Sequence, residues 1–330
     1  MFIKRGEIMS KSMRFIRHTI YIGQPSERTS CVVGDINNDG TPEVIIAARE
    51  PKREIYWLGR ARSGQWEYHL IDDTFDRVEA GGALADIDGD GKLELVAGGD
   101  WQGNIIYWWD SPDDPTKPWI RREIFRMPQN QSHDQMIADV DGDGKNELIA
   151  GLSWYRPPKK LGENWERHEF ARGYVSPKSV VADFDCDGKP EIVISEGDAS
   201  LNNRQYGRVV MFKSKNDPTD MWEPYILHNK LLDPHSLQTA DFDGDGTPDL
   251  FVGEMGLPNG DHPHPPAQRI YLSRGNKMEE HIIDEGIGTH EAKVIVIDDK
   301  VGIVGKPYRN LRSSAPRGPE VDGVHLWLPE

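Results

Sequence analysis

Five acidic strings of one form recur along the chain. Each reads D-x-(D/N)-x-D-G-x-x-(D/E), with oxygen-bearing side chains at positions 1, 3, 5 and 9 and a glycine at position 6. In a tight turn these oxygens converge on one point, which suits a hard cation such as calcium with its about 6 to 8 oxygen ligands. The glycine permits the sharp turn. We expect calcium to be bound by Asp35, Asn37, Asp39, Glu43, Asp86, Asp88, Asp90, Glu94, Asp139, Asp141, Asp143, Glu147, Asp183, Asp185, Asp187, Glu191, Asp241, Asp243, Asp245 and Asp249.

We expect the acidic loops to stabilise the fold and not to carry out chemistry. Carboxylates this close together repel one another unless a cation lies between them. A bound cation also occupies the oxygens that hold it, so they are not available to a substrate. The first loop has Asn37 in place of a carboxylate, and it should bind its ion more weakly than the other four.

Three histidines share one phase of the repeat. His133 and His235 each lie six residues before the first aspartate of an acidic loop, and His290 lies six residues before Val296, which takes that place in a unit without a loop. The three imidazoles can bind one zinc, manganese or iron ion, or can act as acid and base. The alternative is that they reflect shared repeat ancestry and bond only to backbone groups.

The elements that position these residues are short strands. The first residues of the five strings are 51, 53, 44 and 58 residues apart, and an alternating apolar stretch stands on each side of every string. These stretches predict two strands joined by the acidic turn. A third strand follows in most units, and a fourth often begins at a tryptophan. Four strands in about 50 residues are typical of one blade of a β-propeller.

A sixth unit lacks the acidic loop and its fourth strand, and the N-terminal stretch at 15–23 can supply that strand. The prediction is therefore an all-β fold: a single β-propeller of six four-stranded blades at 13–330, preceded by a flexible tail at 1–12. A seventh blade is less favoured because no further strands can be found. A linear array of hairpins is the alternative, but it would leave strand edges exposed.

The five strings and their flanking strands, such as ADIDGDGKLELV in the second unit, resemble the FG-GAP/VCBS repeats of integrin-α-type propellers. The resemblance extends from about residue 15 to residue 330 and implies a calcium-binding propeller. It specifies function less well, because that family includes adhesion modules, carbohydrate binders and lyases. The chain is also similar, more weakly, to the propeller domains of rhamnogalacturonan and ulvan lyases and of aldos-2-ulose dehydratases.

The face opposite the acidic turns should carry the function. There the connections between second and third strands are long, and they include 153–164, 195–207 and 253–268. Their polar and aromatic side chains suit a sugar ligand, although the aromatic rings can equally pack the loops themselves. The candidate substrate-binding residues are Trp101, Trp154, Tyr155, Arg204, His262 and His264. The tryptophans at third and fourth strands, in contrast, are expected to pack between blades.

The favoured hypothesis is a carbohydrate-acting carbon–oxygen lyase or dehydratase that performs β-elimination on a uronic acid or keto-sugar. Such a reaction needs a base, an acid and a group that stabilises the enolate. His133, His235 and His290 could hold a metal or supply the base, Tyr308 could be the acid, and a substrate carboxylate could be neutralised by Arg77, Lys178, Lys306 or Arg309. The alternative is a binding module that recognises a glycan or a protein without chemistry.

The amino-acid composition limits the classes of partner that the protein is expected to bind. Lys and Arg number 39 against 55 Asp and Glu, and the net charge of −16 disfavours nucleic acid. No apolar run approaches the about 20 residues of a membrane span. The two cysteines cannot form a disulfide framework. We expect a monomer. The N-terminus shows no signal peptide, which favours the cytoplasm, whereas calcium loops favour a secreted or periplasmic protein.

Overall fold

The apolar stretches on either side of each acidic string form neighbouring antiparallel strands, as the alternation predicts. In the first unit, β2 (Arg28–Gly34) pairs with β3 (Glu43–Ala48), and the acidic loop joins them. The computed structural model describes residues 13–23, 26–49, 52–75, 78, 80–98, 103–127, 133–160, 163–257, 263–275, 277–307 and 322–330. The predicted tail at 1–12 lies outside these residues.

The described residues contain 24 strands in six antiparallel sheets of four, and one 3₁₀ helix, η1 (Ser200–Asn202). Blade 1 adds β4 (Glu54–Arg60) and β5 (Trp66–Asp72) to β2 and β3. Blade 2 contains β6 (Ala83–Ala85), β7 (Glu94–Gly98), β8 (Ile105–Asp110) and β9 (Ile120–Arg126). Blade 3 contains β10 (Gln135–Ala138), β11 (Glu147–Ala150), β12 (Ser153–Arg156) and β13 (Glu166–Glu169).

The remaining three blades follow the same order. Blade 4 contains β14 (Pro177–Ala182), β15 (Glu191–Glu196), β16 (Gly207–Lys213) and β17 (Glu223–Leu231). Blade 5 contains β18 (Pro234–Ala240), β19 (Asp249–Glu254), β20 (Ala267–Arg274) and β21 (Lys277–Glu285). Blade 6 contains β22 (Glu291–Ile297), β23 (Lys300–Lys306), β24 (Val324–Pro329) and β1 (Phe15–Tyr21).

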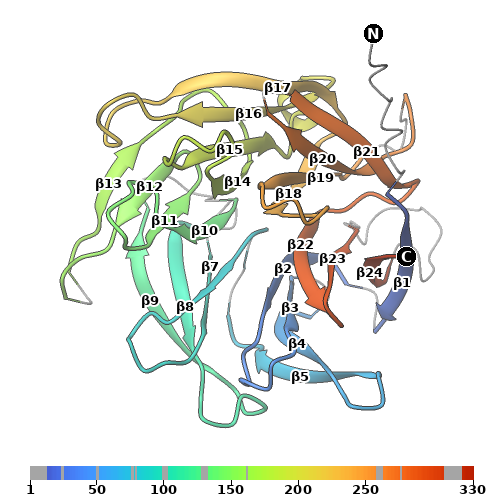
Figure 1. Ribbon diagram of the computed structural model, residues 1–330. Coiled ribbons are helices and arrows are strands. Elements are labelled where there is room, and N and C mark those ends of the chain that lie inside the picture. The colour runs from blue at the N-terminus through green and yellow to red at the C-terminus, as the bar shows by residue number, and fades with distance from the viewer. Residues whose placement is uncertain are drawn as a thin grey trace, which may run out of the picture.

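The six sheets are arranged as a ring around an axis (Figure 1). The first strand of each blade is the innermost, and each inner strand contacts the next one around the ring, from β2 through β6, β10, β14 and β18 to β22 and back to β2. The predicted six-bladed propeller is therefore confirmed. The described parts of the connections that lead into inner strands lie at one end of the axis, and the acidic loops lie at the other.

The last blade is completed by the N-terminal strand, as predicted. β1 pairs with β24 along its length, so the first described strand lies beside the last one (Figure 1). Side chains reinforce this closure toward blade 5, because Trp327 Nε1 and Arg17 Nη1 both donate to Asp284 Oδ2, at 2.7 Å and 3.0 Å. The pairing removes the edge that β24 would otherwise expose.

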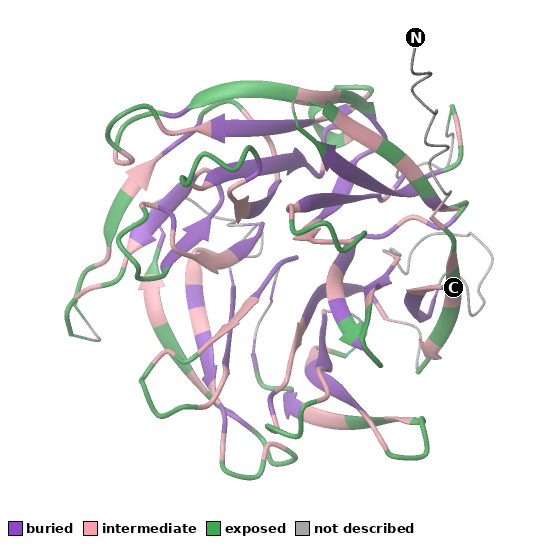
Figure 2. Cartoon of the chain, in the orientation of Figure 1, coloured by how far each residue is buried: buried purple, intermediate pink, exposed green. Residues whose placement is uncertain are grey.

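The apolar cores lie between successive blades. Second strands such as β3 and β15 are buried along their whole length, whereas most of the exposed strand residues belong to the outermost strands (Figure 2). Indole groups also join neighbouring blades. Trp57 of blade 1 donates to the carbonyl of Pro115 in blade 2 (3.1 Å), and Trp154 of blade 3 donates to the carbonyl of Pro218 in blade 4 (3.3 Å). Trp222 shares the second carbonyl at 2.9 Å.

Blade 3 differs from the sequence prediction. The chain turns within two residues after β11, with Gly151 at φ 64°, and β12 begins at Ser153. The sequence predicted that the segment 153–164 is a loop on the face of the histidines. This prediction is wrong. The first four residues of the segment are the third strand, and the following prolines lead into the connection on the opposite face. The prediction failed because the prolines obscured a strand of only four residues.

No helix among the described residues is long and apolar enough to cross a membrane.

Removal of residues 1–23 should lower the melting temperature by several degrees and promote self-association. The deletion takes away β1, so the buried residues of β24 lose their cover and its edge becomes available for pairing. Removal of residues 1–12 alone is the matched control and should leave both properties unchanged. Differential scanning calorimetry and size-exclusion chromatography measure the two effects. A monomeric Δ1–23 variant with an unchanged melting temperature would show that β1 does not close the ring.

Candidate functional site

The three predicted histidines meet at the end of the axis where the chain enters the inner strands. His133 precedes β10, His235 is the second residue of β18, and His290 precedes β22. The rings of His133 and His235 have centroids 4.7 Å apart, and His235 stacks on His290 at 4.0 Å. All three side chains are buried. Blades 3, 5 and 6 thus bring their imidazoles into one cluster.

A carboxylate that sequence reasoning missed completes the cluster. Asp198 lies in the connection between β15 and β16, with Oδ2 3.1 Å from His133 Nε2 and Oδ1 3.6 Å from His235 Nε2. One ligand atom from each of these three residues lies within 4.8 Å of the others. At the repeat phase of Asp198 the other units with a loop have Glu50, Trp101, Trp154 and Gly256, so the repeat gave only a weak signal besides the place of Asp198 in a long, polar connection.

His290 has a different role from the other two histidines. Its backbone carbonyl accepts a hydrogen bond from His235 Nδ1 (2.6 Å), and its own Nδ1 lies 2.9 Å from the Lys306 amine. Because a carbonyl only accepts, His235 carries its proton on Nδ1, and its Nε2 lone pair faces Asp198. The two groups that converge on Asp198 are therefore His133 and His235. The group that could hold a metal ion is therefore His133, Asp198 and His235, in place of the three predicted histidines.

The charges of this cluster follow from burial and from its own contacts. Burial lowers the pKa of His235, against the opposing effect of Asp198, so its imidazole is neutral near neutral pH. Burial favours the protonated form of Asp198, but the hydrogen bond and charge of His133 outweigh it and hold the pKa of that carboxyl well below its usual range. The cluster therefore combines a neutral base with an ionised carboxylate.

The segment that carries Asp198 is held in place at several points. Asp233 accepts a hydrogen bond from the backbone N–H of Ser200 (2.9 Å) and another from its hydroxyl. The buried carboxylate of Glu196 binds Arg204 and Arg208, each at 2.6 Å. Arg204, predicted to bind substrate, is thus placed where it ties the ends of this connection together.

A buried ion network lies below the histidines and spans the axis. Lys178 Nζ is 2.5 Å from Glu291 Oε2 and donates to the carbonyl of His133 at 3.2 Å. Lys293 pairs with the other oxygen of Glu291 at 3.1 Å. Gly81 donates its N–H to Glu291 (3.0 Å) at φ 101°, where a side chain would collide with blade 3. Blades 2, 3, 4 and 6 are thereby joined across the axis.

The network also determines the backbone of His133. This residue has φ 58°, a left-handed conformation that costs about 1 kcal/mol or more for a residue with a side chain. The hydrogen bond from Lys178 to its carbonyl holds it there.

Lys178 and Lys306 were predicted to neutralise a substrate carboxylate, but the structure engages both amines within the protein. Lys178 is engaged by Glu291 and His133, and Lys306 is fully buried and donates to the carbonyl of Arg28 (2.6 Å). Burial holds the pKa of Lys306 well below its usual value. Neither amine is presented to a ligand. The sequence could not reveal this because the partners come from other blades.

Trp154 and Tyr155 were predicted to stack on a sugar, but the structure buries both rings. Both lie on β12 and are 0% and 3% exposed. Trp154 packs on His168 (4.2 Å between centroids) and Tyr155 on Phe125 (4.9 Å), so their faces are covered. The cause is the misplaced third strand of blade 3.

The other candidates lie apart from the cluster or outside the described residues. His264 is partly exposed, with Nδ1 3.0 Å from the neighbouring carbonyl of Pro265. The predicted residues that fall outside the described part of the chain are Arg77, Trp101, His262, Tyr308 and Arg309.

The acidic loops share one geometry at the opposite end of the axis. The acid at position 9 accepts a hydrogen bond from the N–H at position 2, for example Ile36 to Glu43 and Phe242 to Asp249, both at 2.9 Å. In the four fully acidic loops, carboxylate oxygens from at least three of the predicted ligands lie within 4.8 Å of one another. Burial and neighbouring carboxylates raise the pKa of Glu94 to about 7.

The donor set of these loops fits a hard cation. Glu94 and Glu147 are 0% and 1% exposed, and each has one carboxylate oxygen without a hydrogen-bond partner. A buried carboxylate oxygen left this way is expected to bind an ion or a water. The residues present therefore fit a cation, and calcium binding by the loops stays a prediction.

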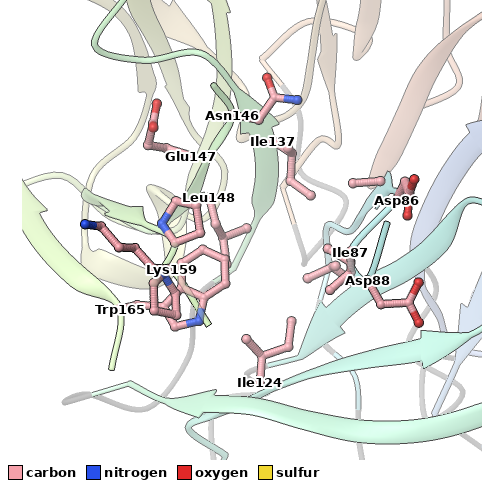
Figure 3. Close-up of a pocket in the computed structure, with 14 residues that line it drawn as sticks. Asp86, Ile87, Asp88, Ile124, Ile137, Asn146, Glu147, Leu148, Lys159 and Trp165 are labelled. Atoms are coloured by element: carbon pink, nitrogen blue, oxygen red, sulfur yellow. The ribbon is translucent and has the colours of Figure 1, made fainter. Parts of the chain in front are cut away.

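A cavity of about 390 Å³ opens beside two of these loops, between blades 2 and 3 (Figure 3). Asp86 and Asp88 line one side, and Lys159 and Trp165 line the other.

Comparisons with known proteins agree with this architecture. A family model described as FG-GAP-like repeat matches residues 86–150 and 183–252, and one described as FG-GAP repeat matches residues 234–271. No curated protein matches the sequence.

Solved structures resemble the chain in fold. A gluconolactonase of Xanthomonas campestris is 12% identical over 98% of this chain and 96% of its own, with a TM-score of 0.56. A mutant of AofleA from Arthrobotrys oligospora is 10% identical over 91% and 85%, with a TM-score of 0.54. A protein of unknown function from Dyadobacter fermentans is 11% identical over 97% and 98%, with a TM-score of 0.58. At these identities the likeness shows the fold alone.

Replacement of Lys178 by methionine should cost about 3–5 kcal/mol of stability, because it leaves Glu291 as a buried charge with half of its compensation lost. The double variant Lys178→Met/Glu291→Met removes both charges but leaves Lys293 with only the charge of Asp134, so it should recover part of that loss. Urea unfolding measures both. A double variant no more stable than the single one would show that the pair is not the source of the effect.

Proposed function

The chain is an FG-GAP-repeat β-propeller, and we propose that it is a carbohydrate-acting carbon–oxygen lyase whose reaction centre is the cluster of His133, Asp198 and His235. The observation that carries the proposal is the convergence of two buried imidazoles on one ionised carboxylate at the end of the axis. Groups of opposed protonation preference in one site are the arrangement that acid–base catalysis requires.

β-Elimination assigns a task to each member of the cluster. His235 is neutral and its Nε2 bears a lone pair, so it can accept the proton from the carbon next to a uronate carboxylate or a ketone. The electron pair of that C–H bond forms the new double bond, and the C–O bond to the leaving oxygen breaks. Asp198 then stabilises the imidazolium that forms on His235. His133 can return a proton to the leaving oxygen.

The same residues fit a transition metal. The bond from His235 Nδ1 to a backbone carbonyl is the second contact that metal-ligating histidines usually make. His133 Nε2, His235 Nε2 and Asp198 would hold the ion, and its charge would stabilise an enolate. Elemental analysis of the purified protein for zinc, manganese and iron decides between the metal-bound and the metal-free form of the proposal.

The choice of a sugar-derived substrate rests on the resemblance of the repeats to those of carbohydrate-acting propellers; the gluconolactonase among the structural neighbours is compatible with it but supports only the fold. A binding module without chemistry is the second candidate. It is favoured by the burial of Lys178 and Lys306, which removes two of the predicted partners of an anionic substrate from reach.

Replacement of His235 by glutamine or of Asp198 by asparagine should lower turnover by about 10²- to 10⁴-fold, because each removes a group that moves or stabilises the proton. Turnover is followed by the ultraviolet absorbance of unsaturated products from a panel of uronate-containing oligosaccharides and keto-sugars. His18→Gln, on the exposed face of β1, is the matched control. Glycan binding by the unmutated protein without turnover on any substrate would replace the lyase by a binding module.

We propose further that the five acidic loops bind calcium and stabilise the ring. Chelation should lower the melting temperature and speed the reaction of Cys186 with a thiol reagent, since this exposed cysteine occupies position 4 of the fourth loop. Cys31 is the internal control: it is fully buried, which raises its pKa to about 12, and it should stay unreactive until the protein unfolds. Equal melting temperatures and Cys186 rates with calcium and with chelator would refute the role of calcium.

A further inference from the structure

The third strand of each blade with an acidic loop ends in a charged residue. These residues lie at the loop end of the axis, because every third strand runs toward that end. In chain order they are Arg60, Asp110, Arg156, Lys213 and Arg274. The repeat thus places one charge of variable sign beside each loop.

In blades 3 and 4 this residue is basic and binds the carboxylate at position 3 of the loop. Arg156 binds Asp141, and Lys213 binds Asp185. Lys213 Nζ also lies 3.5 Å from Glu191 Oε1 at position 9 of its loop.

Blade 5 has the same arrangement. Arg274 binds Asp243 at position 3, and its Nη1 is 3.0 Å from Asp245 Oδ2. In all three blades the basic side chain is 29–38% exposed, so solvent and salt weaken but do not abolish its field.

Blades 1 and 2 lack this contact. In blade 2 the residue is Asp110, which pairs with Arg122 at 2.7 Å, and among the described residues no cation pairs with Asp88 at position 3. Lys159 lies across the cavity from Asp88 (Figure 3). Lys92 contacts only position 5 of this loop.

In blade 1 the loop has no carboxylate at position 3, and the arginine at the end of the third strand pairs with a residue outside the loop. Position 3 is Asn37, and Arg60 binds Asp298 of blade 6 at 3.2 Å. A basic contact is therefore found at position 3 only where that position is a carboxylate and the third strand ends in Arg or Lys.

We propose that the last residue of the third strand sets the calcium affinity of the acidic loop in its own blade. The inference rests on the proposed binding of calcium. A fixed positive charge on a ligand oxygen competes with a divalent ion for that oxygen and repels it, whereas Asp110, which is paired with Arg122, places no such charge on position 3 of the second loop. In the second loop a cation contacts one proposed ligand, Asp90, whereas in the third, fourth and fifth loops cations contact two ligands each. The second loop therefore binds calcium most tightly, and the other three bind it more weakly.

The same contacts give those three loops a way to keep their shape at low calcium. When the ion leaves, Arg156, Lys213 or Arg274 neutralises part of the exposed charge, so the carboxylates do not drive the loop apart. The ring then loses its ions in order, with the second loop among the last to release.

The fourth loop allows a direct test because Cys186 reports on it alone. Calcium is titrated against the rate at which a thiol reagent labels Cys186. In Lys213→Met, the calcium concentration that gives half-protection should fall about three- to tenfold at low ionic strength, and the shift should shrink in high salt. Lys213→Arg should behave like the unmutated protein, and Lys230→Met, on β17 of the same blade, is the matched control.

The outcomes separate this inference from the proposal beneath it. If calcium protects Cys186 in the unmutated protein but Lys213→Met has the same midpoint, the strand-end residue does not set affinity and the inference is overturned. If calcium never protects Cys186, the calcium proposal itself fails for this loop. Asp110→Lys supplies an independent measurement: calorimetry should show that the tightest calcium site is weakened by a similar factor, and an unchanged tightest site would contradict the ranking of the loops.

Discussion

The pairing of β1 with β24 closes the ring, and the positions of the axial residues depend on that closure. The cluster at the mouth takes His133 from blade 3, Asp198 from blade 4 and His235 from blade 5, with His290 of blade 6 behind them. Residues so far apart in sequence meet only if each blade packs on the next around a complete turn. The interblade cores and the shared indole contacts of Pro218 keep that packing rigid.

Buried charge at the axis is the main cost of this arrangement, and the protein compensates it locally. Glu291 is balanced by Lys178 and Lys293, and the same lysine holds His133 in its left-handed conformation. Charges taken out of water are tolerated only when they are paired and hydrogen-bonded. The network therefore supports the histidines from below and does not itself face a ligand, which is why its lysines could be mistaken for binding residues in the sequence.

The ionisable residues form two separate groups, one at each end of the axis. At the mouth a few groups from different blades have their protonation shifted by burial and by one another, which is typical of a reactive site. At the other end, nineteen of the 55 acidic side chains stand in loops that suit cations. Basic strand ends such as Lys213 moderate that acidity blade by blade. Much of the net charge of −16 therefore belongs to the loops and says little about the mouth.

The sequence by itself determined the blade, the number of blades, the closure of the last blade and the acidic loops, because each depends on local periodicity that repeats along the chain. It also brought out His133, His235 and His290, since a common repeat phase implies a common end of the axis. Only the tertiary structure decided which residues face one another across that axis. It added Asp198, which the repeat marks only weakly, and it buried Lys178 against Glu291, because contacts between blades depend on the closed ring and leave no periodic trace in the chain.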